Sequence, residues 1–150
     1  MSPENKESEK DESKKQRYLF KITVVGPEDS LLEDVLSVIN EDVISIDGIR
    51  IAATSHETDK LEVQAVTMSP QHSALDSMES MTFTGANAVL IILPVADIET
   101  ETIYRNKIRE NLGTGIPTRV CIIGSKMTKP KREEIAHCFD EMLEELTRNT

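Results

Sequence analysis

From Tyr18 onward, stretches whose apolar residues are spaced as in a strand alternate with stretches whose apolar residues are spaced as in a helix. Short runs rich in β-branched residues predict five strands, at residues 18–25, 49–54, 60–68, 87–95 and 119–123. Apolar residues three or four apart predict four helices, at residues 30–40, 75–81, 104–112 and after Pro130. A polar loop at residues 56–59 joins the second and third strands, so these two are expected to form an antiparallel hairpin.

Two of the predicted strands are apolar on both faces. Residues 87–95 have the sequence NAVLIILPV, and residues 119–123 have the sequence RVCII. Strands of this kind are typical of parallel sheets that helices cover above and below. We therefore expect an α/β three-layer sandwich of about five mainly parallel strands that includes the hairpin.

The first 17 residues contain no Val, Ile, Leu or Phe, and they hold five acidic and five basic residues. Such a segment buries too little apolar area to offset the entropy cost of ordering it. Residues 1–17 are therefore predicted to be a disordered charged tail, and residues 18–150 the folded domain. Because the charges of the tail cancel, the net charge of −10 belongs to the domain. A negative domain is a poor match for nucleic-acid phosphates and for anionic membrane surfaces.

Residues that could carry chemistry are few. Cys121 and Cys138 cannot supply a four-ligand zinc site, and their apolar surroundings are typical of buried thiols. No metal or cofactor is expected. The longest apolar run, residues 88–93, is far too short to span a membrane, and no signal peptide or lipidation motif is visible. We therefore expect a cytoplasmic protein without a direct membrane anchor.

Four segments resemble strands of the Ras-like small GTPase superfamily. FKITVVG (residues 20–26) resembles the strand that leads into the phosphate-binding loop, and KLEVQAV (60–66) resembles the strand before the DxxG motif. GANAVLIILPVAD (85–97) and IPTRVCIIGSKMTK (116–129) are similar to the fourth and fifth strands. Residues 24–36 are also similar to the degenerate first loop of the centromere protein M family of kinetochore pseudo-GTPases.

The phosphate-binding loop of the family, GxxxxGK[ST], is degenerate in this chain. Its first glycine is present as Gly26, whereas Leu31 stands at the second glycine. Leu32 stands at the lysine and Glu33 at the hydroxyl residue. In the family the lysine contacts phosphates and the hydroxyl ligates Mg²⁺. Leu32 has no charge to offer a phosphate, and Glu33 replaces the neutral hydroxyl with a negative charge.

Acidic residues surround the start of the first predicted helix. Glu28, Asp29 and Glu33 place three carboxylates near a helix N-terminus, where they would repel a triphosphate. The same residues are equally typical of helix caps, and Ser30 with Glu33 predicts a capping box.

The other nucleotide motifs are degenerate as well. Ala65 and Met68 stand at the Asp and Gly of DxxG, and Thr128 replaces the guanine-binding Asp of NKxD. The vestigial nucleotide-site positions are therefore Gly26, Leu32, Glu33, Ala65, Met68, Ser125, Lys126 and Thr128. Only 22 residues follow Thr128, so the resemblance implies that the sixth strand of the family is lacking.

The resemblance implies a pseudo-GTPase, without enzymatic activity, that has lost nucleotide binding and serves as a protein-interaction or scaffold subunit. Its partner would be a protein, either a true small GTPase or the subunits of a larger complex, and not a nucleic acid. The alternative is a divergent small GTPase that binds GTP or GDP through a remodelled loop. A receiver-like phosphoacceptor module would use Glu28 and Asp29, but the early hairpin argues against it.

Two surfaces are candidates for partner contact. Residues 119–123 would form an exposed sheet edge if no sixth strand covers them. The last helix has an acidic face that is either simply solvated or steers a basic partner, formed by Glu133, Glu134, Asp140, Glu141, Glu144 and Glu145. Asp97 matches a carboxylate of the family and is expected to be a cap or turn residue.

Overall fold

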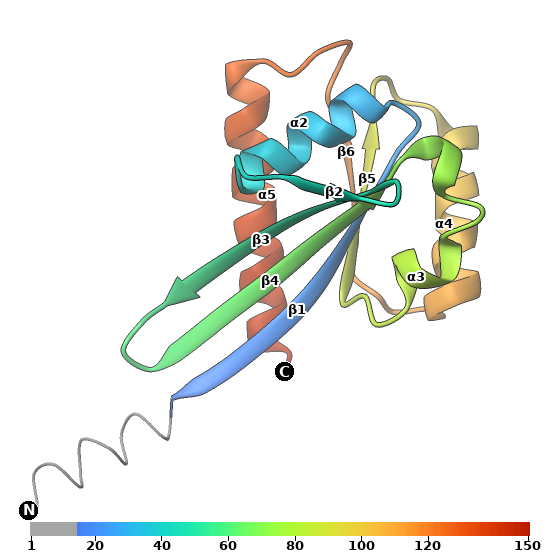
Figure 1. Cartoon of the computed structure of the whole chain (residues 1–150). Helices are drawn as coiled ribbons and strands as arrows, with labels where there is room; N and C mark the ends of the chain where they lie inside the picture. The colour runs from blue at the N-terminus through green and yellow to red at the C-terminus, as the bar shows by residue number, and fades with distance from the viewer. Residues whose placement is uncertain (1–14) are drawn as a thin grey trace, which may run out of the picture.

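The computed structural model describes residues 15–150, and the greater part of the predicted tail, residues 1–14, lies outside the described residues. Residues 15–150 contain a mixed six-stranded sheet with the strand order β2-β3-β4-β1-β5-β6. Helices cover both faces of this sheet (Figure 1). The predicted α/β class is therefore confirmed.

The parallel half of the sheet has β1 at its centre. Its four strands are β1 (Gln16–Val25), β4 (Leu61–Pro70), β5 (Ala88–Leu93) and β6 (Thr118–Ile122). β1 pairs in parallel with β4 and β5, and β5 pairs in parallel with β6. All residues of β5 are buried because the strand is covered on both faces, as its apolar run predicted.

The antiparallel half contains β2 (Ile44–Ile46) and β3 (Ile49–Glu57). β3 pairs with β4 over its whole length, which confirms the predicted hairpin. β2 pairs with the beginning of β3 and forms the outer edge of the sheet.

Two helices lie on each face of the sheet. α2 (Asp29–Ile39) and α5 (Lys129–Arg148) pack on one face. α3 (Glu79–Phe83) and α4 (Ile98–Leu112) pack on the other (Figure 1). The apolar stripe predicted for the last helix is buried, at Ile135, Phe139, Met142 and Leu146.

The prediction of five strands without a sixth was wrong, because the sheet has six. The additional strand is β2, at the hairpin edge. Asp47 and Gly48 join β2 to β3 with φ values of 51° and 81°. Two consecutive positive φ values are typical of the tight turn that an Asp-Gly pair favours. After β6 the chain forms α5, so β6 is the other edge of the sheet.

Two details of the predicted helices were also wrong. The N-cap of α2 is Glu28, and Ser30 lies inside the helix, so Ser30 and Glu33 do not form a capping box. The helix predicted at residues 75–81 is a 3₁₀ turn (His72–Ala74) followed by the short α3. The deeply buried aromatic of that segment is Phe83, whereas Met81 is exposed. Within the described part of the chain, no helix is long and apolar enough to cross a membrane.

Candidate functional site

The segment that follows β1 is the one whose sequence resembles a phosphate-binding loop. β1 ends at Val25, and α2 begins four residues later at Asp29. A Cβ atom added to Gly26 would lie 2.3 Å from the backbone oxygen of Ile92 in β5. No side chain fits at that distance. The approach of β5 therefore explains the glycine without any phosphate.

Two backbone amides in the first turn of α2 are already hydrogen-bonded within the helix. The amides of Leu31 and Leu32 both donate to the carbonyl oxygen of Glu28, at N···O distances of 3.1 Å. These two residues match the second glycine and the lysine of the phosphate-binding motif. Their donors close the first turn of α2, so they are not directed at a site where phosphate oxygens could lie.

Leu32 belongs to the hydrophobic core. Its side chain is 1% exposed and packs in the cluster shared by the sheet, α2 and α5. Leu31 is buried in the same cluster. Full burial of a leucine contributes about 1.5–3 kcal/mol to folding. The position that matches the phosphate-binding lysine therefore contributes to packing.

A buried guanidinium lies beside the N-terminus of α2. Arg50 of β3 is 5% exposed, and its Nη2 donates to Asp29 Oδ1 at 3.1 Å and to the Pro70 oxygen at 3.0 Å. Asp29 Oδ1 also accepts a hydrogen bond from the His72 amide at 2.9 Å. This group, which we call the Asp29–Arg50 cluster, ties α2 to the ends of β3 and β4.

The Asp29–Arg50 cluster holds Asp29 in its charged form. Partial burial raises the pKa of Asp29, but hydrogen bonds from the His72 amide and Arg50 outweigh it, and the pKa lies below its ordinary value. A carboxylate in the first turn of a helix also interacts favourably with the helix dipole. A carboxylate paired with Arg50 thus lies at the positive end of α2.

Ala65 and Met68 lie inside β4 rather than in a loop. Ala65 pairs with Phe20 of β1 and is buried, and Met68 pairs with Thr23 of β1 and Ile51 of β3. β4 continues two residues beyond Met68, to Pro70. The segment that would carry the DxxG motif is therefore fully used in strand pairing.

The segment after β6 holds the other vestigial positions. Ser125 and Lys126 lie in a bend between β6 and α5. Thr128 is the N-cap of α5, and its hydroxyl accepts a hydrogen bond from the Lys131 amide. Thr128 therefore has a structural role that a helix start commonly requires.

Asp97 is likewise a cap, as predicted. It is the N-cap of α4, and its carboxylate accepts hydrogen bonds from the amides of Glu99 and Thr100. Hydrogen bonds from the hydroxyl and amide of Thr100 lower the pKa of Asp97 below its ordinary value.

Exposed apolar side chains gather at the carboxyl ends of β5 and β6. The two strands remain hydrogen-bonded to their ends, through Ile123 N to Leu93 O and Gly124 N to Pro94 O. Val95 and Ile98, which follow β5, are 63% and 72% exposed. Ile122 at the end of β6 is also exposed. We call these three residues, Val95, Ile98 and Ile122, the apolar patch.

β6 leaves its outer edge open within the described residues. The Pro117 oxygen and the Ile123 amide both bond to β5. Because backbone groups alternate in direction along a strand, those of Thr118, Val120 and Ile122 face away from the sheet. An edge of this kind can pair with a strand of another chain.

Several hollows lie on the surface of the described residues, and two of them are near α2. One of about 400 Å³ lies between Pro27 and α4 and is lined by His72, Tyr104 and Lys107. Burial, with the charge of Asp29, raises the pKa of Tyr104 to about 12, so this residue is a neutral phenol at physiological pH.

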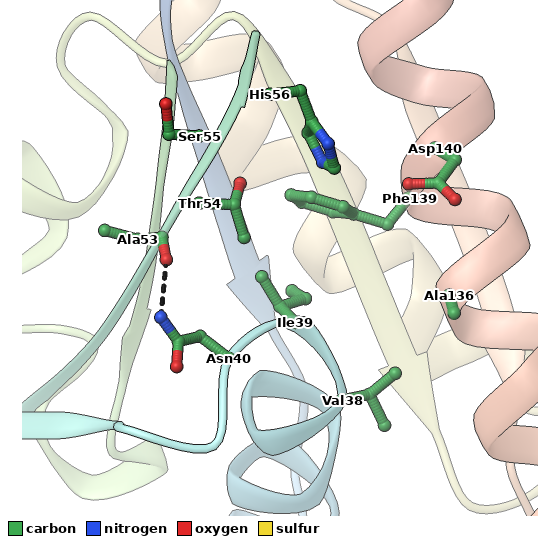
Figure 2. Close-up of a pocket in the computed structure, with 10 residues that line it drawn as sticks. All are labelled: Val38, Ile39, Asn40, Ala53, Thr54, Ser55, His56, Ala136, Phe139 and Asp140. Atoms are coloured by element: carbon green, nitrogen blue, oxygen red, sulfur yellow. Dashed lines mark hydrogen bonds between the residues drawn. The ribbon is translucent and has the colours of Figure 1, made fainter. Parts of the chain in front are cut away.

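Figure 2 shows another hollow, of about 300 Å³, between the end of α2, β3 and α5. Asn40 donates from its amide nitrogen to the Ala53 oxygen at 2.8 Å and so caps part of the β3 edge. His56 lies beside Phe139 at its rim, and the buried hydroxyl of Thr54 has no hydrogen-bond partner among the described residues. At the first hollow, Tyr104 Oη lies 3.4 Å from His72 Nδ1.

Sequence reasoning missed the Asp29–Arg50 cluster. An arginine at one position of an alternating strand gives no sign of whether it points inward. The burial of Arg50 depends on where α2 and the end of β4 lie, and no pattern within β3 contains that information.

Comparison with protein-family models gives no match to this chain, and comparison with curated proteins gives none either.

Proposed function

We propose that the protein is a pseudo-GTPase: a domain with the layered architecture of small GTPases that does not bind nucleotide and acts through contacts with another protein. The observation that carries this proposal is the use of the Leu31 and Leu32 amides. Both donate to Glu28 within α2, whereas a phosphate-binding loop needs such donors free for the phosphates.

Three further features of the vestigial site support the loss of nucleotide. Leu32 is part of the core and cannot be replaced by a solvated lysine without opening that core. The carboxylate of Asp29 occupies the positive end of α2. Ala65 and Met68 are paired within β4, so neither can approach a γ-phosphate or a metal-bound water.

The apolar patch and the open edge of β6 support a protein partner. They adjoin one another, since Ile122 belongs to both. α5 packs beside β6 and presents exposed acidic residues, including Glu133, Glu134 and Glu144. The partner that fits this surface is an extended apolar segment with basic flanking residues, which adds a strand to β6.

Thermal unfolding tests the loss of nucleotide. Any ligand that binds only the folded state raises stability, by about 2.7 kcal/mol when present at one hundred times its Kd. Millimolar GTP or GDP with Mg²⁺ should leave the melting temperature unchanged. A rise of several degrees that saturates with nucleotide would instead favour a divergent GTPase with a remodelled loop.

Two surface variants test the partner. Ile98→Asp places a charge in the apolar patch, and Val120→Pro removes one outward backbone donor of β6 while sparing its bonds to β5. Met81→Asp is the matched control, because Met81 is 57% exposed but lies on α3, away from the patch.

Quantitative affinity capture from the native host would compare these variants. A genuine partner should be recovered at least about tenfold less with Ile98→Asp and with Val120→Pro, corresponding to about 1.4 kcal/mol of binding free energy. Its recovery with Met81→Asp should equal that of the unchanged chain. Equal recovery of every captured protein by all three variants would refute this interface.

A further inference from the structure

The two cysteines of the chain face each other across the interface of β6 and α5. Their sulfur atoms lie 3.9 Å apart, and both residues are partly exposed. The sequence led us to expect two separate buried thiols. Seventeen positions separate them in the chain, and the packing of α5 on the edge strand brings them together.

The geometry is close to that of a disulfide precursor. A disulfide has an S–S distance of about 2.05 Å, so the sulfur atoms need to approach by about 2 Å. β6 is an edge strand with one open side, and α5 follows a bend at Ser125 and Lys126.

A positive charge lies beside the pair. Arg119 precedes Cys121 by two residues, so it projects from the same face of β6 toward α5. Its guanidinium contacts Glu141 at 3.0 Å and Glu145 at 3.3 Å. The groups that face the two sulfurs are Arg119 from β6 and the carboxylates of Glu134 and Glu141 from α5.

The two thiols differ in acidity. The hydrogen bond shared with Cys121, together with the charge of Arg119, lowers the pKa of Cys138 below its ordinary value against the opposing effect of burial. The hydrogen bond to Cys138 and burial raise the pKa of Cys121. The thiolate is the reactive form, and the hydrogen bond and charge of Arg119 favour it on Cys138.

We propose that Cys121 and Cys138 form a modification site at which hydroperoxides are reduced and an intramolecular disulfide is made, with Cys138 as the attacking thiol and Cys121 as the resolving thiol. This site is independent of the proposed loss of nucleotide binding.

The reaction proceeds in two steps. The Cys138 thiolate attacks one oxygen of hydrogen peroxide; the O–O bond breaks, the sulfur becomes a sulfenic acid, and hydroxide leaves and is protonated to water. Cys121 then attacks the sulfenic sulfur, the S–O bond breaks, and a second water leaves as the S–S bond forms. In total, two thiols and one peroxide give one disulfide and two waters.

The disulfide would link the edge strand to α5 across the bend at Ser125 and Lys126. Closing a loop restricts the unfolded chain, so the oxidised protein should melt several degrees higher than the reduced protein. Backbone amides of the bend should also exchange with solvent more slowly, because α5 can no longer separate from β6.

The test treats the full chain with stoichiometric hydrogen peroxide and follows it by intact mass and peptide mapping. The unchanged chain should lose two hydrogen atoms and give a peptide that joins Cys121 to Cys138, and dithiothreitol should reverse both changes. Cys121→Ser should stop at a sulfenic acid on Cys138, which dimedone traps. Cys138→Ser should react at least about tenfold more slowly. Circular dichroism would first establish that both serine variants are folded.

The pH dependence gives a second readout. The rate of Cys138 alkylation in Cys121→Ser should rise with pH, and Arg119→Gln should move the midpoint of this rise to higher pH. Crosslinks only between molecules, sulfinic acid without an internal disulfide, or equal peroxide reactivity of the two serine variants would each overturn the proposal.

Discussion

Leu32→Ala probes the replacement at the centre of the proposed function, because Leu32 stands where a phosphate-binding lysine would stand. Its side chain is 1% exposed and packs against the sheet and α5. Alanine lacks three carbon atoms of leucine, and each buried CH₂ group is worth about 0.8 kcal/mol. The lost transfer free energy is therefore about 2.4 kcal/mol, and the cavity left behind raises the total to about 3 kcal/mol.

Urea unfolding followed by circular dichroism measures this change. With a urea m-value of about 2 kcal/mol/M, a loss of 3 kcal/mol lowers the unfolding midpoint by about 1.5 M. Leu19→Ala is the matched control, since Leu19 lies in β1 but is 68% exposed. Its cost should stay below about 0.5 kcal/mol.

The unfolding midpoints of Leu32→Ala and Leu19→Ala together show whether Leu32 contributes to the core. If Leu32 merely fills a vacant ligand site, Leu32→Ala should cost no more than Leu19→Ala. Equal midpoints for these two variants would refute the view that the lysine position has become part of the core.

Three other substitutions test individual contacts. Gly26→Ala should lower the free energy of unfolding by about 1–3 kcal/mol in urea titrations, because its Cβ would lie 2.3 Å from the Ile92 oxygen; an unchanged midpoint would contradict this. Asp29→Asn should cost about 1 kcal/mol at pH 7, a modest value because the Asp29 side chain is 48% exposed although Arg50 is buried. The folded-state pKa of Asp29 is lowered from 3.8, so this contribution is fully present above that pH and is lost as the pH falls through the folded value. Thermal unfolding of both proteins between pH 2 and 7 should therefore show converging stabilities at low pH, and a constant difference would contradict this origin. Asp97→Ala should lower the melting temperature measurably, whereas Asp97→Asn should lower it much less, because asparagine also accepts hydrogen bonds from the first amides of α4. An equal decrease in melting temperature for both variants would argue against a capping role.

The central elements of the fold were predictable because each has an apolar pattern that extends over many neighbouring residues. β5 is a continuous apolar run, and α5 carries a long stripe of apolar residues at helical spacing. The strand β2 was missed because three residues are too few to show a period. The Asp47–Gly48 pair between two isoleucines was the available signal for this additional hairpin.

The start of α2 was harder to place, since several residues there are suitable caps. Ser30 and Glu33 match a capping box, yet the carbonyl of Glu28 accepts the first bonds of the helix. Asp29 instead binds Arg50 and the His72 amide, which lie 21 and 43 positions away in the chain. Long-range partners of this kind do not appear in a local pattern.

In the candidate site, too, local features were predictable and long-range contacts were not. The sequence alone shows that Leu32 is apolar and Thr128 a suitable helix cap, and the structure adds that Leu32 lies in the core and that Thr128 is the N-cap of α5. The proximity of Cys121 and Cys138 was not predictable, because it depends on the register of β6 beside α5.

Nuclear magnetic resonance titration with GTP and Mg²⁺ tests the central claim most directly, because it reports on each amide of the vestigial site. We expect the amide signals of Gly26, Leu31, Leu32 and Lys126 to stay in place at millimolar nucleotide, since the Leu31 and Leu32 donors are bonded to Glu28. Saturable shifts centred on these amides, reproduced with GDP and absent with Mg²⁺ alone, would contradict the account.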